Sequence, residues 1–170
     1  MSVTVFGHRL HPILAAFPIG LLGGSVAFDI LYLATANSRW GDISFWMLAA
    51  GVVGGLVAAP FGSLDWFSIA PGTRAKRIGL YHGATAVTSI AIFAVSAWLR
   101  YETPTEPGML AIILSFVAQT VLLVAGWLGG ELVERMGIGV HPGAHGNSPN
   151  SLSGRPAFDT GDAKSESRIA

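Results

Sequence analysis

Residues 11–33 read HPILAAFPIGLLGGSVAFDILYL, an apolar stretch that opens on a histidine and contains a single charged residue, Asp29. The hydrocarbon core of a bilayer is about 30 Å thick, and a helix that rises about 1.5 Å per residue needs roughly 20 mostly apolar residues to cross it. The stretch therefore predicts a transmembrane helix. Pro12 falls in its first turn, where a missing N–H does no harm.

Three further apolar stretches follow, at about 43–64, 78–99 and 109–132. The connections between them are short and contain turn-forming residues, so consecutive helices are expected to be antiparallel neighbours. The sequence thus predicts an all-α integral membrane protein, with an antiparallel four-helix transmembrane bundle over residues 1–140. Residues 141–170 are rich in Gly, Ser, Pro and Asp and are predicted to form a disordered polar tail.

The composition points in the same direction. Hydrophobic residues make up 51% of the 170 residues and charged residues only 12%, whereas a soluble domain carries about a quarter charged residues. Ten Lys plus Arg balance ten Asp plus Glu, so the chain lacks the basic surface that nucleic acid requires, and we expect no nucleic-acid partner. The chain has no cysteine, which excludes disulfides, Cys-ligated zinc and iron–sulfur clusters.

The distribution of Lys and Arg predicts the orientation of the bundle. The side that holds both termini carries most of the cations near the spans, namely Arg9, Arg74, Lys76, Arg77 and Arg135. The opposite side has only Arg39 and Arg100, the latter assigned to the connection after the third span. By the positive-inside rule, both termini are predicted to be cytoplasmic.

Ionisable residues inside the spans are the candidate functional residues, because burying such a group in a membrane is costly. The predicted topology places one from each helix at the cytoplasmic end: His11, Asp65, His82 and Glu131. Asp29 lies 18 residues after His11, on the same helix face but about 27 Å away. Stripes of glycine and hydroxyl residues on the later spans have two interpretations, ordinary helix packing or room for a flat cofactor.

Two histidines at one depth on non-sequential helices are typical of the axial ligands of a b-type haem. In this hypothesis the second ring nitrogen needs a partner, such as Asp65 or a backbone carbonyl. Glu131 either does the same or relays protons, and arginines just outside the membrane neutralise the propionates. The residues expected at a haem b site are therefore His11, His82, Asp65, Glu131, Arg74 and Arg77.

Two other readings of the same sequence stay open. His11, His82, Asp65 and Glu131 could instead hold a first-row metal ion or handle protons. Alternatively, the chain is a non-enzymatic accessory subunit that stabilises a larger membrane complex through its small-residue faces. No set of nucleophile, base and orienting group is visible, so independent catalytic activity is not expected.

Several motifs along the chain resemble a known family. They are His11-Pro12, Phe17-Pro18-Ile19-Gly20, Gly62-Ser63-Leu64-Asp65-Trp66, Pro71-Gly72-Thr73-Arg74-Ala75, Gly79-Leu80-Tyr81-His82-Gly83 and Gly126-Trp127-Leu128-Gly129-Gly130-Glu131-Leu132-Val133. Together they resemble the small bacterial membrane proteins grouped as domain of unknown function 2231, over about residues 7–140. The resemblance implies a four-helix domain in the bacterial cytoplasmic (inner) membrane, with His11, Asp29, Asp65, His82 and Glu131 as its signature polar positions.

The same resemblance also implies a class of function. In similar proteins such a domain is joined to a Rieske iron–sulfur domain, which implies electron transfer as an expectation. This chain has no cysteine for a Rieske cluster. A redox partner protein, a quinone or a larger membrane complex would therefore have to be a separate component.

Overall fold

The computed structural model of the chain describes residues 2–160, and four long helices dominate them. A two-stranded antiparallel hairpin precedes the first helix, a π-helical turn extends the last one, and a short 3-10 helix lies near the end. The elements are β1 Thr4–Val5, β2 His8–Arg9, α1 Leu10–Thr35, α2 Ser38–Ser68, α3 Arg74–Arg100, α4 Met109–Gly130, η1 Glu131–Arg135 and η2 Ser151–Ser153.

All four helices are long and apolar enough to cross a membrane. Their outward faces carry large apolar side chains, among them Phe17, Trp98 and Trp127, which are 69%, 81% and 67% exposed. Such a surface requires lipid around it, because a soluble protein does not expose apolar patches of this extent. The predicted all-α integral membrane fold, an antiparallel four-helix transmembrane bundle, is therefore confirmed.

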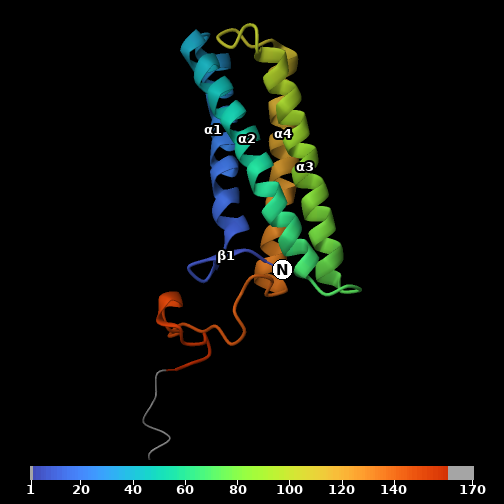
Figure 1. Cartoon of the computed structure of the whole chain (residues 1–170). Helices are drawn as coiled ribbons and strands as arrows, with labels where there is room; N and C mark the ends of the chain where they lie inside the picture. The colour runs from blue at the N-terminus through green and yellow to red at the C-terminus, as the bar shows by residue number, and fades with distance from the viewer. Residues whose placement is uncertain (1, 161–170) are drawn as a thin grey trace, which may run out of the picture.

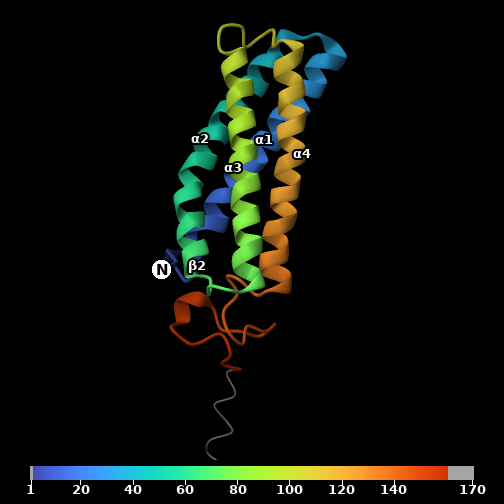
Figure 2. The same ribbon diagram turned by 90° about the vertical axis from the view of Figure 1, so that its right-hand side faces the viewer.

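The helices pair as two antiparallel hairpins (Figures 1 and 2). Helix α1 packs mainly on α2, which we call the first hairpin, and α3 packs mainly on α4, which we call the second. Between the hairpins, α2 lies closer along α3 than α1 does along α4. The starts of α1 and α3 lie at one end of the bundle, called here the terminal end, and their ends lie at the far end.

The helices extend beyond the predicted spans, and this changes the position of several charged residues. Asp65, one residue past the predicted end of the second span, lies in α2, and Arg74 and Arg77 lie at the start of α3. Arg100 is the last residue of α3 and not part of a loop. At the starts of α2 and α3, side-chain caps favour helix beyond the apolar runs. For example, the Asn37 side chain accepts a hydrogen bond from Arg39 N at 3.1 Å, so α2 begins at Ser38.

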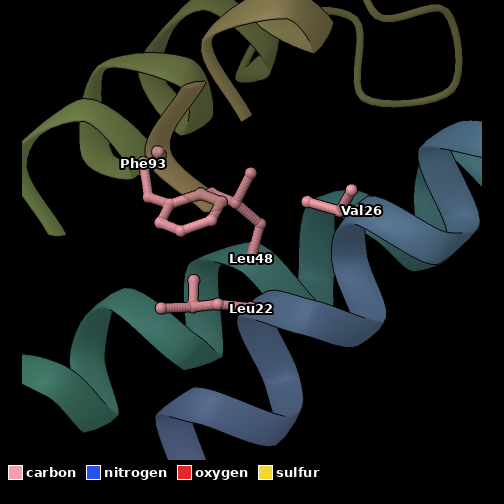
Figure 3. Packing of buried hydrophobic residues seen from close by; sticks show 5 residues of the cluster. Leu22, Val26, Leu48 and Phe93 are labelled. Carbon is pink, nitrogen blue, oxygen red and sulfur yellow. The ribbon is translucent and has the colours of Figure 1, made fainter. Parts of the chain in front are cut away.

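The hydrophobic core lies between the two hairpins (Figure 3). Leu22 and Val26 of α1, Leu48 of α2 and Phe93 of α3 pack there with Ala118 of α4. Close packing is essential in a membrane, where lipid removes most of the hydrophobic drive between helices and van der Waals contact must replace it.

The segments outside the bundle gather below its terminal end (Figure 1). His141 Nε2 lies 3.1 Å from the carbonyl oxygen of Gly7, which links the tail to the turn of the β1–β2 hairpin. Of the tail predicted to be disordered, residues 141–160 contain hydrogen-bonded turns and η2. Residues 161–170 lie outside the described part of the chain.

Candidate functional site

His11 and His82 face each other across the terminal end of the bundle. His11 lies in the first turn of α1 and His82 lies in the third turn of α3, so each hairpin supplies one ring. The ring centroids are 6.3 Å apart and the ring planes meet at 79°. The structure thus brings together the two residues that the sequence places at one depth.

Each histidine is held by the backbone of its partner helix. Nδ1 of His11 lies 3.2 Å from the carbonyl oxygen of Ala58, and Nδ1 of His82 lies 2.8 Å from that of Ala125. Because a carbonyl oxygen can only accept, Nδ1 is the donor in both rings, and in the neutral imidazole Nε2 keeps its lone pair. This is how metal-binding histidines are usually oriented. A backbone carbonyl, rather than Asp65, orients each imidazole.

Glycines make the close approach of these rings possible. A Cβ atom at Gly62 would lie 2.8 Å from Cε1 of His11, and one at Gly129 would lie 3.2 Å from Cε1 of His82. In each case the glycine belongs to the helix whose carbonyl holds the ring. The space beside these two glycines is therefore taken by the imidazoles. Gly62 belongs to a stripe for which the sequence predicts helix packing or room for a flat cofactor.

The two carboxylates near the histidines pair with arginines. Asp65 Oδ1 lies 3.6 Å from Arg9 Nη1, an ion pair without hydrogen-bond geometry. Glu131, in the π-helical turn, accepts a hydrogen bond of 2.9 Å from Arg74 Nη2. Arg77 is exposed near the start of α3. Within residues 2–160 no three His, Cys, Asp or Glu side chains lie close enough to hold a metal ion, so the four-residue metal site does not assemble there.

Sequence reasoning missed a second polar cluster, which lies at the far end of the bundle. We call it the far-end network, and its members are Asp29, Ser44, Ser96, Arg100 and Ser115. Asp29 and Arg100 are both fully buried, with 0% exposure. Arg100 Nη1 and Nη2 donate to the two carboxylate oxygens of Asp29 at 2.7 and 2.8 Å.

The serines complete the far-end network from the other helices. Arg100 also donates to Ser44 Oγ and Ser115 Oγ, both at 3.0 Å. Ser44 donates to Asp29 at 2.6 Å, and Ser96 lies 3.0 Å from Ser115. The network therefore contains residues of all four helices. A signal for it exists in the sequence, because Arg100 follows His82 by the same 18 residues that separate Asp29 from His11.

The two hairpins are built on one plan. Adding 71 to the numbers of three polar residues of α1, His11, Ser25 and Asp29, gives His82, Ser96 and Arg100 of α3. On the second helices the offset is 67, and it relates the supporting pair Ala58 and Gly62 to Ala125 and Gly129. The histidines make equivalent contacts with these supporting pairs in both hairpins. The site therefore has an approximate twofold axis along the bundle, as in membrane proteins with parallel repeats.

Comparison with known proteins gives one match. The family described as Predicted membrane protein (DUF2231) matches residues 7–142, which include both histidines and the whole far-end network. No curated protein and no solved structure matches the chain.

Proposed function

Because this chain belongs to the DUF2231 family of predicted membrane proteins, whose description names no activity, we propose a function from the site itself. We propose that the chain is a small haem-b-binding electron-transfer subunit of the bacterial cytoplasmic membrane. His11 and His82 would bind the haem iron through Nε2, one from each hairpin.

The spacing of the two histidines is the observation that carries this proposal. With metal–nitrogen bonds of about 2 Å and about 1 Å from each nitrogen to its ring centre, two imidazoles on opposite sides of one ion have centroids about 6 Å apart. The separation of 6.3 Å agrees with that arrangement. The backbone contacts of both Nδ1 atoms support it further, because a neutral imidazole that donates from Nδ1 has its Nε2 lone pair available for a metal.

The number of available ligands favours haem over a bare metal ion. A haem iron takes four nitrogens from its own macrocycle and needs only two from the protein. A bare first-row ion usually needs three or four protein ligands. Among residues 2–160 the histidine pair has no third His, Cys, Asp or Glu close enough to join it.

Other residues of the terminal end would support the bound group. When bound, haem b would supply a one-electron iron couple, which a side chain of this protein cannot provide. Arg74 and Arg77, at the start of α3, would neutralise the propionates, although Arg74 now bonds Glu131. A quinone or a separate redox protein would give and take the electron, and the chain would have no catalytic activity of its own.

The test is a reduced-minus-oxidised absorption spectrum of detergent-purified protein expressed with ample haem. We expect the sharp α-band of low-spin haem in the wild type. His11→Ala and His82→Ala should each abolish it, because each removes one axial ligand. His141→Ala is the matched control and should leave the spectrum unchanged, since His141 lies outside the bundle.

Two outcomes would contradict the proposal. An unchanged spectrum in His82→Ala would refute the ligand assignment. A flat trace from folded, haem-replete wild type would refute haem binding altogether. Metal analysis of that colourless protein would then separate a metal-binding role of the histidines from the accessory-subunit reading.

A further inference from the structure

The hydrogen bonds that join the two hairpins are unevenly distributed along the bundle. Within residues 2–160, side-chain hydrogen bonds between helices of different hairpins form at two places. One is the far-end network, where Arg100 bonds Asp29 and Ser44. The other is the α2–α3 connection, where Trp66 Nε1 and Lys76 Nζ each donate to the backbone carbonyl of the other residue at 2.9 and 2.7 Å.

Apart from the Trp66–Lys76 contacts beside the α2–α3 connection, the polar contacts around the histidines at the terminal end close within one hairpin. His11 bonds Ala58 of α2, and His82 bonds Ala125 of α4. The ion pairs follow the same rule: Arg9 with Asp65 belongs to the first hairpin, and Arg74 with Glu131 belongs to the second. The histidine rings themselves meet across the hairpins without a hydrogen bond between them. Each half of the site would therefore keep its own contacts if the hairpins moved apart.

Burial follows the same gradient. The side chains that are less than 2% exposed are Arg100, Phe93, Leu22, Leu48, Ile112, Asp29, Ser25, Ser44, Ser89, Ser96 and Ser115. Ser89 is the member nearest to the histidines, about two turns along α3 from His82, and the others lie farther toward the far end. His11 and His82 are only half-buried. The largest fully buried side chains are thus concentrated toward the far end, whereas the histidine rings at the terminal end are half-buried. Regions with fewer buried contacts open at lower free-energy cost.

The contacts also indicate between which two helices the hairpins can separate. Helices α2 and α3 are joined by their short connection and by the Trp66–Lys76 contacts. Helices α1 and α4 approach each other at few places along their length. Opening at the terminal end therefore widens the space between α1 and α4, which is the side of the bundle opposite the α2–α3 connection.

We infer that Asp29 and Arg100 are positioning residues for the histidine site. They hold the hairpins together at the far end while the hairpins rotate apart at the terminal end, along α1 and α4, to admit a flat ligand between His11 and His82. The identity of that ligand as haem rests on the proposed function. The motion itself does not, because it follows from the distribution of contacts along the bundle.

Pulsed electron paramagnetic resonance tests the motion directly. The chain has no native cysteine, so two introduced cysteines can carry spin labels without background. One labelled pair reports on the terminal end, Ile13→Cys with Trp127→Cys, and a second reports on the far end, Leu31→Cys with Met109→Cys. All four side chains are exposed, and each pair joins α1 to α4.

In lipid nanodiscs without added haem, we expect a broad distance distribution for the terminal pair and a narrow one for the far pair. A far-end distribution as broad as the terminal one would overturn the inference. Added haemin should narrow the terminal distribution and leave the far one unchanged. If haemin has no effect but the two widths still differ, the proposed haem function is refuted, and the inferred rotation of the hairpins about the far end is supported. If haemin binds but the two distributions are equally broad, the inferred rotation of the hairpins is refuted and the proposed haem function is supported.

Neutral variants test whether the Asp29–Arg100 ion pair holds the two hairpins together at the far end. Asp29→Asn combined with Arg100→Gln should broaden the far-end distribution to the width of the terminal one. Arg39→Gln, an exposed cation at the same end, is the matched control and should change neither. If the double variant does not fold, Arg100→Lys keeps the charge but loses the two-pronged contact, and should broaden the far-end distribution in part. An unchanged far-end width in the folded variant would remove Asp29 and Arg100 from this role.

Discussion

At the scale of single residues, the histidine site depends on the backbone carbonyl and the glycine that support each ring as much as on the rings themselves. A backbone carbonyl fixes the orientation of each imidazole, and a glycine on the same helix leaves room for it. Both supporting groups come from the neighbouring helix of the same hairpin. Each half-site is therefore complete before the hairpins meet, which limits the freedom that the rings must lose when a ligand binds.

Gly62→Ala tests the close approach of His11. The new methyl group would lie 2.8 Å from the ring, so the ring or α2 must shift. We expect a loss of stability of about 1–3 kcal/mol, as for other overpacked sites, measured by thermal unfolding in detergent. Gly126→Ala is the matched control, because a Cβ there meets nothing within 4 Å. It should be neutral or slightly stabilising, and equal effects of the two substitutions would contradict the packing of His11 on Gly62.

At the scale of the helices, the far-end network explains how a charged pair is tolerated at the bundle interior. Each hydrogen-bonding oxygen of Asp29 has a partner, and both terminal nitrogens of Arg100 have two. Removal of one member alone would leave a buried charge without its partner, which is far more costly than removal of both.

A double-mutant cycle measures this coupling. Asp29→Asn and Arg100→Gln should each lower the free energy of unfolding by about 3–5 kcal/mol. The double variant should lose clearly less than the sum of the two, because neither charge is then left alone. Thermal or denaturant unfolding in detergent gives the four values. Simple additivity would show that the two side chains do not interact in the folded protein.

The helices themselves follow from the sequence, but their side-chain partners do not. Apolar runs and short connections are enough to predict four antiparallel spans, and helical rise is enough to place His11 and His82 at one depth. The connection after the third span is predicted to begin at Arg100, because the residues up to Gly108 include turn-forming Pro and Gly. The side chain of Arg100 bonds a carboxylate 71 residues earlier, and local patterns do not report such a partner.

The same limit applies to the two carboxylates near the histidines. Asp65 and Glu131 were expected to face the histidines, yet each meets an arginine of its own hairpin. Which way a side chain near a helix end turns depends on the rotation of that helix against its neighbour, and residue spacing leaves this rotation undetermined. The sequence therefore defines the level of the site along the bundle better than it defines the contacts within it.

At the scale of the whole molecule, the described segments before α1 and after η1 lie at the same end of the bundle (Figure 1). The excess of Lys and Arg at that end predicts that it faces the cytoplasm. A tag fused after Ala170 should then be protected from added protease in intact spheroplasts and be cleaved once the membrane is permeabilised. Cleavage in intact spheroplasts would reverse the orientation and place the histidine pair near the outer face of the membrane.

The shared plan of the hairpins has a consequence for assembly. Asp29 and Arg100 occupy equivalent positions, yet they carry opposite charges. If the first hairpins of two chains paired with each other, two aspartates would meet inside the membrane, and two second hairpins would bring two arginines together. Like charges in that environment repel strongly and lack hydrogen-bond partners. The charges therefore favour pairing of a newly made first hairpin with the second hairpin of its own chain over pairing with the first hairpin of another copy.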